Sequence, residues 1–209
     1  MFRRAVAISV WSCLVAATAF AATPFREGVD YDRVARPQAT SSPAGRVEVA
    51  EVFQYGCGGC AALEPRLEQW VAAKPDYVDF IRIPAVWNAL GELHARAYYT
   101  AEVLGVLDKI NAPMFNAIHA EGNHLETPAK LRAFFAQFGV DAKTFDATFE
   151  SFAVQAKLAR AKDLVTRYNI PETPSIVVDG RYLTRGKLAQ GYDRWFEIVE
   201  GLAGEAHGP

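Results

Sequence analysis

Four short stretches of the chain are rich in β-branched and aromatic residues, a composition that predicts strands. The first is RVEVAEVFQY, residues 46–55, which we interpret as a central strand, and the second is YVDFIRIPAV, which ends near Pro84. The other two lie within SIVVDGRYLTRG, on either side of a turn at Asp179-Gly180.

Apolar residues at helical spacing predict helices over most of the remaining chain. In CAALEPRLEQWVAA they recur at Leu63, Leu67 and Trp70, and Pro65 predicts a kink within this helix. Helical patterns then fill the long segment between the second and third strands and return near the C-terminus. The predicted helices after the second strand cover about Leu93–Leu107, Pro128–Gly139 with Thr127 as its cap, a stretch that opens at Asp141, Ser151–Tyr168 and Gly191–Leu202.

The order of these elements predicts an α/β fold. A small mixed sheet is interrupted, between its two halves, by a helical insertion at about residues 86–168. The flanks of this insertion, at Pro84 and Ile170, are short and apolar rather than linker-like, which favours one domain over two.

The composition agrees with a single globular domain. The chain has 209 residues, 51% of them apolar, and a formal net charge of −2, which is enough apolar sequence for a sizeable core. The near-neutral charge argues against nucleic-acid binding, because such proteins normally carry a basic patch or stripe.

The first residues have the pattern of a secretory signal. A basic Met1-Phe-Arg-Arg start is followed by an apolar run, Ala5–Ala19, and by a small-x-small cleavage site at Ala19-Phe20-Ala21. We therefore predict a signal peptide at residues 1–21, a mature chain of residues 22–209, and a location in an oxidising compartment, a bacterial periplasm. An uncleaved membrane anchor is the alternative, although the run is short for a spanning helix. Cys13 lies in this run, and its fate stays open.

Beyond that segment the chain has two cysteines, Cys57 and Cys60, separated by two glycines. A purely structural disulfide here would close a very small loop and stabilise the fold little. A zinc site needs four ligands, but there is no second cysteine pair, and His94, His119 and His124 lack paired ligand spacing. We expect no metal and favour redox chemistry, with these two interpretations as alternatives.

The position of the pair between a strand and a helix also favours redox chemistry. A thiol at a helix N-terminus faces free N–H groups and the positive end of the helix dipole, and both favour the reactive thiolate. Cys57, at or beside the N-cap, would be the exposed nucleophile, and Cys60, one turn further, would resolve mixed disulfides. Gly58 and Gly59 carry no side chain that would hinder a substrate.

Three features together resemble the DsbA-type thiol–disulfide oxidoreductases of the thioredoxin superfamily. They are the segment EVFQYGCGGC after a signal peptide, the helical insertion, and the segment ETPSIVVDGRYLTRG. The resemblance covers nearly the whole mature chain and implies a thioredoxin fold with an inserted helical domain.

The resemblance also implies roles for residues far from the cysteines. Thr173-Pro174 matches the dipeptide before the third strand of the fold, which implies a cis proline facing the cysteines and a Thr173 backbone that pairs with an extended substrate. From the residues alone, a trans Pro174 ending the preceding loop is equally compatible. Glu51 lies at the position of a partly buried acid of the family, which implies that it relays protons to Cys60. The alternative is that Glu51 is an exposed charge on an edge strand. Arg82 would then pair with Glu51, since a buried charge needs a partner.

The two residues between the cysteines depart from the familiar Cys-Pro-His-Cys of the family. The histidine, a cationic neighbour that helps to hold the thiolate, is absent here. The pKa of about 3.5 and the potential of about −120 mV of DsbA are therefore not expected. We predict a milder oxidant.

Disulfide donation is the activity that the resemblance implies. The Cys57–Cys60 disulfide would pass to reduced or unfolded secreted proteins through a mixed disulfide, without a bound cofactor, and a quinone-linked membrane partner of the DsbB type would reoxidise the pair. We expect a monomer. An isomerase of this compartment is usually a dimer with a separate dimerisation domain, and the segment Phe25–Gly45 before the first strand is too short for one. A reductase or isomerase, a metal chaperone and a binding protein with inert cysteines remain alternatives.

Aromatic residues recur at helical spacing, and most of them are expected in the core. A few would line a hydrophobic groove for unfolded clients, and the sequence leaves open which ones. The residues concerned are Trp70, Trp87, Phe134, Phe135, Phe138, Phe145 and Phe149.

Overall fold

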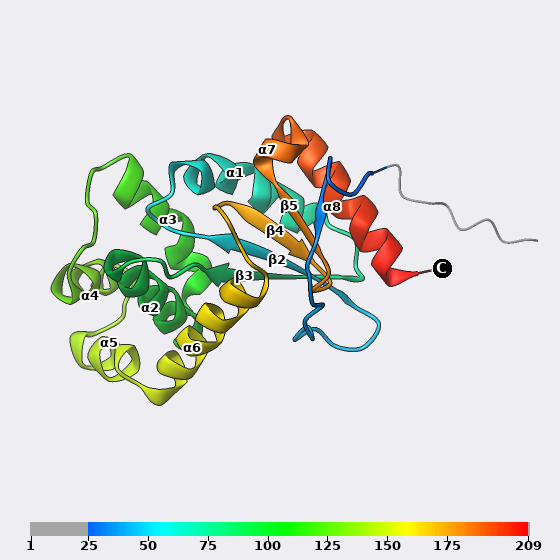
Figure 1. The fold of residues 1–209 in the computed structure, drawn as a ribbon. Coiled ribbons are helices and arrows are strands. Elements are labelled where there is room, and N and C mark those ends of the chain that lie inside the picture. Colours follow the sequence, from blue (N-terminus) through cyan, green and yellow to red (C-terminus); the bar gives the residue numbers. More distant parts are fainter. Residues whose placement is uncertain (1–24, 209) are drawn as a thin grey trace, which may run out of the picture.

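The structure is a computed structural model that describes residues 25–208 (Figure 1). Within this range one mixed sheet has its strands in the order β1-β5-β4-β2-β3. Strand β2 pairs in parallel with β3 and antiparallel with β4, which confirms its predicted central position. The strands are β1 Asp32–Arg33, β2 Val47–Phe53, β3 Val78–Pro84, β4 Ser175–Val178 and β5 Tyr182–Arg185. The predicted signal peptide lies outside the described residues.

A block of helices lies between β3 and β4 in the chain and gathers beside one end of the sheet (Figure 1). The helices of this block are α2 Ala89–Val103, α3 Leu107–His119, α4 Pro128–Ala136, α5 Ala142–Phe149 and α6 Phe152–Arg167. The predicted fold class, an α/β sheet with a helical insertion, is therefore confirmed.

Side-chain caps begin several of these helices as the sequence predicts. The side chains of Thr127 and Asp141 accept hydrogen bonds from the backbone N–H groups of Lys130 and Thr144, respectively. Ser151 caps α6 in the same way. Each cap satisfies an N–H group that has no partner within its own helix.

One predicted helix boundary is wrong. The pattern over Leu93–Leu107 suggested a single helix, but α2 ends at Val103 and α3 begins at Leu107. Gly105 lies between them with a φ of +68°, a conformation that glycine adopts at little cost. Helix α3, strand β1 and the short α7, Gly186–Ala189, were not predicted, and the C-terminal helix α8, Tyr192–His207, is longer than expected.

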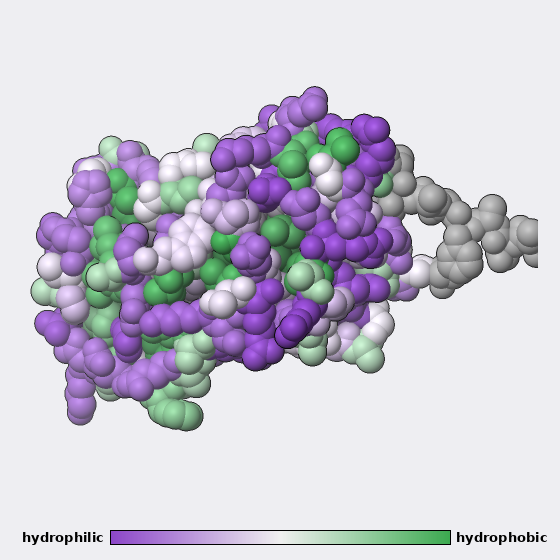
Figure 2. Space-filling view, in the orientation of Figure 1, coloured by the Kyte–Doolittle hydropathy of each residue, from purple (hydrophilic) through white to green (hydrophobic). Residues whose placement is uncertain are grey.

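Two hydrophobic clusters lie on opposite faces of the sheet. Val49 of β2 packs with α8 and with α1, Gly58–Ala73, whereas Ala50 and Val52 pack with the inserted helices. The alternation follows from the twofold side-chain period of a strand. Figure 2 shows hydrophilic residues over most of the surface and apolar residues between them, as expected for a core enclosed by two layers of helices.

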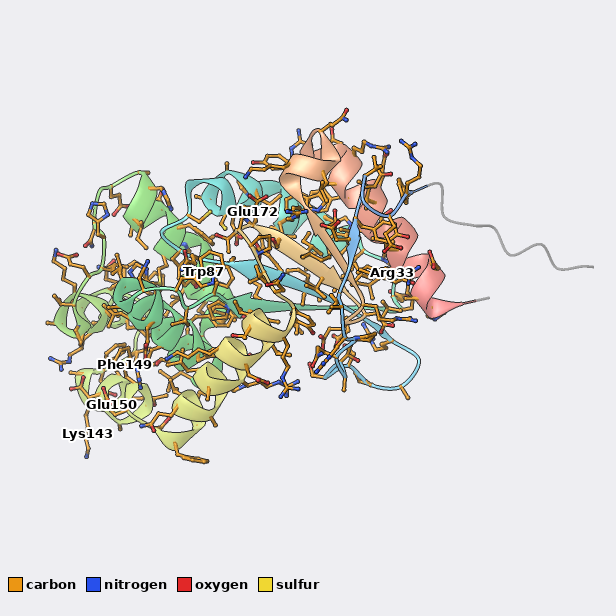
Figure 3. All side chains as sticks on the ribbon, in the orientation of Figure 1. Arg33, Trp87, Lys143, Phe149, Glu150 and Glu172 are labelled. Atoms are coloured by element: carbon orange, nitrogen blue, oxygen red, sulfur yellow. The ribbon has the colours of Figure 1, made fainter. Side chains whose placement is uncertain are left out.

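Most aromatic side chains of the described residues are buried or partly buried, and Trp87 and Phe152 are exposed. Trp70, Phe135 and Phe145 belong to the core as predicted. Trp87 lies in the loop between β3 and α2, is labelled in Figure 3 and is 46% exposed. Its place in the apolar sequence pattern did not distinguish it from the buried aromatic residues.

Candidate active site at the cysteine pair

Cys57 is the N-cap of α1, as the sequence predicts. The chain leaves β2 at Phe53, and the Cys57 N–H donates to the Gln54 carbonyl at 3.0 Å, closing the turn that leads into the helix. The Sγ of Cys57 accepts a hydrogen bond from the Cys60 N–H at 3.4 Å. Cys57 is half-buried, Cys60 is fully buried one turn along, and both thiols are free.

The two thiols have opposite acidities. Hydrogen bonding from Cys60 lowers the pKa of Cys57 to about 5 against the effect of its partial burial, and hydrogen bonding with Thr173 acts in the same direction. The pKa of Cys60 is raised by its hydrogen bond to the Cys57 sulfur, by burial and by the charge of Glu51. At neutral pH the pair therefore consists of a partly exposed thiolate and a buried thiol.

The peptide bond between Thr173 and Pro174 is cis, which confirms the predicted isomer. The dipeptide comes directly before β4 and reaches the cysteines, because the Cys57 Sγ lies 3.3 Å from the Thr173 carbonyl, to which the thiol donates when it is protonated. A Cβ atom placed on Gly59 would lie 3.1 Å from Cδ of Pro174, so the glycine permits the close approach of this proline to α1. At Gly58 a Cβ would meet no atom within 4 Å, and the surface there is open.

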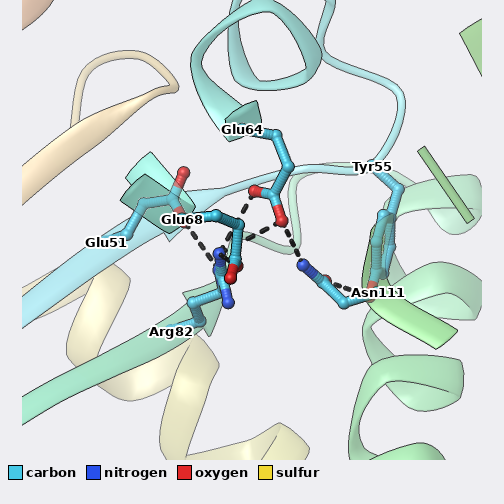
Figure 4. Close-up of polar contacts among 6 residues, drawn as sticks. All are labelled: Glu51, Tyr55, Glu64, Glu68, Arg82 and Asn111. Carbon is cyan, nitrogen blue, oxygen red and sulfur yellow. Dashed lines mark hydrogen bonds and ion pairs between the residues drawn. The ribbon is translucent and has the colours of Figure 1, made fainter. Parts of the chain in front are cut away.

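Glu51 lies on β2, on the face of the sheet that α1 covers, and its side chain is 1% exposed. The alternative of an exposed edge-strand charge is therefore wrong. The Glu51 Oε2 lies 3.1 Å from Nε of Arg82 on β3, which confirms the expected ion pair (Figure 4). The other oxygen, Oε1, is buried and has no hydrogen-bond partner among the described residues.

The same arginine holds two further carboxylates. Its Nη2 lies 3.2 Å from Glu64 and 2.6 Å from Glu68, both on α1 (Figure 4). Asn111 of α3 donates to Glu64 at 2.5 Å and accepts from the Tyr55 hydroxyl at 2.8 Å. This charge cluster, formed by Glu51, Glu64, Glu68 and Arg82 with the Asn111 and Tyr55 side chains, joins the sheet, α1 and the inserted helices.

One guanidinium cannot neutralise these carboxylates completely. Burial raises the pKa of Glu51 to about 7, although Arg82 opposes the shift, and burial raises that of Glu64 to about 7 in the same way. Burial disfavours the charged Arg82, but the carboxylates of Glu51 and Glu64 act more strongly together and keep its pKa above the usual value. Glu51 therefore titrates near neutral pH, and its charge acts on the buried Cys60 thiol.

Glu64, Glu68, Asn111 and Tyr55 were not predicted as parts of the site. For Glu64 a signal exists in the sequence, because it is a single charged residue within the buried stripe Cys60, Leu63, Leu67 of α1. Asn111 had no such signal, because the helix that carries it was not predicted.

The histidines do not form a metal centre with the cysteines. His94 is buried and its Nε2 lies 3.0 Å from the His124 carbonyl, whereas His119 is exposed with its Nε2 2.7 Å from the Tyr55 carbonyl. Across residues 25–208 no group of three or more His, Cys, Asp or Glu side chains is arranged to hold a metal ion. In the same range, none of the helices has both the length and the apolar composition that a membrane crossing requires.

Comparison with known proteins adds independent evidence. Residues 79–203 match the family of DSBA-like thioredoxin domains. The thiol:disulfide interchange protein DsbA of Pseudomonas syringae pv. tomato is 34% identical over 91% of both chains, and that of Burkholderia cepacia is 38% identical over 75% of this chain and 74% of the relative. The chain belongs to the DsbA family.

The solved structures agree with this assignment. The crystal structure of Pseudomonas aeruginosa DsbA superposes with a TM-score of 0.79 and 33% identity, over 84% of this chain and 91% of that one. The chain is thus a protein thiol–disulfide oxidoreductase with the DsbA form of the thioredoxin fold.

Proposed function

We propose that this member of the DsbA family is a disulfide donor. A substrate thiolate attacks Sγ of Cys57 in the oxidised protein, the bond between the two cysteine sulfurs breaks, and Cys60 takes up a proton. A second substrate thiolate then attacks the substrate sulfur of the mixed disulfide and releases Cys57 as a thiolate. The substrate loses two electrons to the cysteine pair and gains a disulfide.

The single observation that carries this proposal is the difference in acidity between the two thiols. A thiol of low pKa is a good leaving group, so release of Cys57 from the mixed disulfide is fast. Its pKa of about 5 also favours the reduced protein at neutral pH, because the thiolate is already stabilised there. Both effects make the pair an acceptor of electrons rather than a donor.

Substrate binding is assigned to the surface around Cys57. The backbone of Thr173, beside Pro174, would pair with an extended substrate segment in the manner of strand addition. The Cys57 thiol hydrogen bond to the Thr173 carbonyl supports this arrangement, because it places the acceptor group next to the reactive sulfur. Gly58 and Gly59 would leave room for the approaching chain, as the open surface at Gly58 suggests.

Glu51 is assigned the role of a proton relay to Cys60. If it is the base for Cys60 when the reduced pair is oxidised, the resolving step should accelerate as the pH rises through about 7, where Glu51 ionises. Glu51→Gln should lose this rise and slow the step about a hundredfold at alkaline pH, a typical contribution of general acid–base catalysis. Stopped-flow oxidation of the reduced protein by a small disulfide, measured across pH, tests this.

Glu64→Gln is the matched control for this experiment. Glu64 contacts the same arginine and its pKa is raised to the same value, but the charge that acts on Cys60 is that of Glu51. The control should retain the pH-dependent rise. Equal profiles for the two variants, or an unchanged profile for Glu51→Gln, would contradict the relay.

The location and the partners follow from the same proposal. Residues 1–21 would be removed on export, and the mature chain, residues 22–209, would act in the periplasm as a monomer on reduced or unfolded secreted proteins. No bound cofactor is required, since the Cys57–Cys60 disulfide carries the electrons. A quinone-linked membrane protein of the DsbB type would reoxidise the pair, and nucleic acid has no part in the reaction.

The equilibrium potential of the Cys57–Cys60 pair tests the direction of the reaction. We expect a value between about −120 and −180 mV, well above the thioredoxin level of about −270 mV, in a titration against glutathione buffers. The thiolate of Cys57 stabilises the reduced form, whereas the absent histidine keeps the potential below that of the strongest oxidants. A value at or below the thioredoxin level would instead assign the chain to disulfide reduction.

A further inference from the structure

A cavity of about 470 Å³ lies at the free edge of β3, away from the cysteines. Neither Cys57 nor the Thr173-Pro174 dipeptide lines it. Its floor includes Phe80, Ile81 and Arg82, and its walls come from α1 on one side and from α2 and α3 on the other. Because Phe80 and Ile81 point to opposite faces of the sheet, the cavity straddles the strand edge itself.

The backbone of β3 has unpaired hydrogen-bonding groups at this edge. The Ala85 N–H donates to the Phe53 carbonyl and the Tyr77 carbonyl accepts from Val47, so the odd-numbered residues of β3 face β2. Phe80 and Arg82 therefore direct their N–H and C=O groups outward, and no hydrogen bond from the described residues reaches these groups. An edge of this kind is a template for another strand.

The two ends of this edge are closed. The carbonyl of Val78 accepts from the Arg46 side chain at 2.9 Å, and its N–H donates to the Pro75 carbonyl. At the other end Pro84 has no N–H to offer. The open section thus covers Phe80 to Arg82, which presents two donors and two acceptors, enough for a short extended segment.

The charges around the cavity select the kind of segment. Glu68, Glu102 and Asp108 line it, one from each of the three surrounding helices. Among the described residues that line the cavity, Arg82 is the only cation, and it already pairs with Glu51, Glu64 and Glu68. Apolar side chains, among them Val71 and Leu107, also line the cavity. The lining therefore combines apolar contacts with an excess of negative charge.

We propose that the free edge of β3 binds an extended peptide segment of alternating basic and apolar residues by strand addition. Backbone hydrogen bonds to Phe80 and Arg82 hold the segment in register. Because its side chains alternate between the two faces of the sheet, its apolar side chains contact Val71 on the α1 side, and its lysine or arginine side chains pair with Glu102 and Asp108 on the side of α2 and α3. This β3-edge site is a second contact surface for a basic region of a protein partner, additional to the surface at the cysteines.

The probe is the capped peptide acetyl-Lys-Val-Lys-Val-Lys-amide, titrated into the reduced full-length mature protein and followed by the backbone amide resonances. We expect the amides of Phe80 and Arg82 to shift and to exchange with solvent more slowly on binding. The peptide in which glutamate replaces each lysine should bind at least about tenfold more weakly, because it meets like charge.

N-methylation distinguishes strand addition from adsorption to an acidic surface. An added strand uses the N–H groups of alternate residues only. One peptide is methylated on the two valine nitrogens, and a second peptide is methylated on the central lysine nitrogen. One of them should therefore bind about tenfold more weakly than the unmethylated peptide, and the other should bind with unchanged affinity. Equal affinity for both methylated peptides would overturn strand addition, and absence of binding at millimolar concentration would overturn the site.

Two glutamates of α2 provide matched protein variants. Glu102 pairs with Lys157 of α6 and lines the cavity, whereas Glu92 pairs with Lys162 of the same helix and does not. Glu102→Gln should weaken binding of the lysine peptide severalfold, and Glu92→Gln should leave it unchanged. Equal effects of the two substitutions would mean that only the general negative charge of the protein attracts the peptide.

Discussion

Replacing Cys60 by alanine is expected to stop catalysed disulfide exchange and to leave Cys57 covalently joined to substrate proteins. Without Cys60 no internal disulfide can form, so the variant has no disulfide to donate, and a mixed disulfide at Cys57 can no longer be resolved by Cys60. The oxidation of a reduced substrate should fall to the uncatalysed rate. With a substrate protein that already carries a disulfide, the Cys57 thiolate attacks one substrate sulfur, the substrate disulfide breaks and its other sulfur leaves as a thiolate. Non-reducing electrophoresis after alkylation should show these adducts, which disappear when a reducing agent is added.

The same variant should raise the pKa of Cys57. Hydrogen bonding from the Cys60 side chain is the largest cause of the low value in the native protein, and alanine removes it. The Cys60 backbone N–H, 3.4 Å from the sulfur, is retained, so the pKa should stay below that of a free thiol. The pH dependence of alkylation measures this, with a native midpoint near pH 5.

Cys57→Ala is the control for both measurements. It should form no adduct, because the remaining Cys60 is buried and its pKa is raised. Adducts on Cys60 in this variant, or continued turnover by Cys60→Ala, would show that the roles of the two cysteines are assigned the wrong way round.

The parts of the site that are local in sequence could be predicted from it. Cys57 and Cys60 are three residues apart between a strand and a helix, so their positions at the N-cap and one turn inward follow from short-range rules. Asp179-Gly180 likewise predicted the hairpin of β4 and β5. The isomer of Pro174 was different: the residues around it left cis and trans open, and only the resemblance to a family decided it.

The parts that depend on tertiary packing could not be predicted in the same way. Glu51 and Arg82 were paired only as an inference from burial, and the partners Glu64 and Asn111 come from helices whose placement no local pattern specifies. Asn111 illustrates the reason, because its role depends on where the chain turns at Gly105 to begin α3. A turn of this kind is a small local feature with a large effect on which side chains meet.

Replacing Arg82 by methionine is expected to destabilise the reduced protein by roughly 3–5 kcal/mol at pH 8, the cost of leaving buried charges without a partner. The Arg82 side chain is 11% exposed, and it is the cation that Glu51 and Glu64 share inside the protein. Glu68 contributes little to this loss, because its side chain is half exposed. Chemical denaturation of the native and variant proteins measures the difference.

The loss should shrink as the pH falls. In the folded native protein the pKa values of Glu51 and Glu64 are raised to about 7, above their unfolded values, so these groups favour folding when protonated and oppose it when ionised. Without the arginine their pKa values rise further, and protonation removes the unpaired charges. The difference between variant and native stability should therefore be large above pH 7 and much smaller at pH 5.

Arg66→Met is the matched control, because Arg66 also pairs with a carboxylate across helices but does so at the surface. Arg66 and Asp193 are 53% and 80% exposed and lie 2.6 Å apart. A surface pair of this kind contributes at most about 1 kcal/mol, and its loss should depend little on pH between 5 and 8. If Arg82→Met behaved like this control, Arg82 would stabilise little buried negative charge at pH 8. Glu51 and Glu64 would then be neutral in the native protein as well, and Glu51 could not act as the base for Cys60.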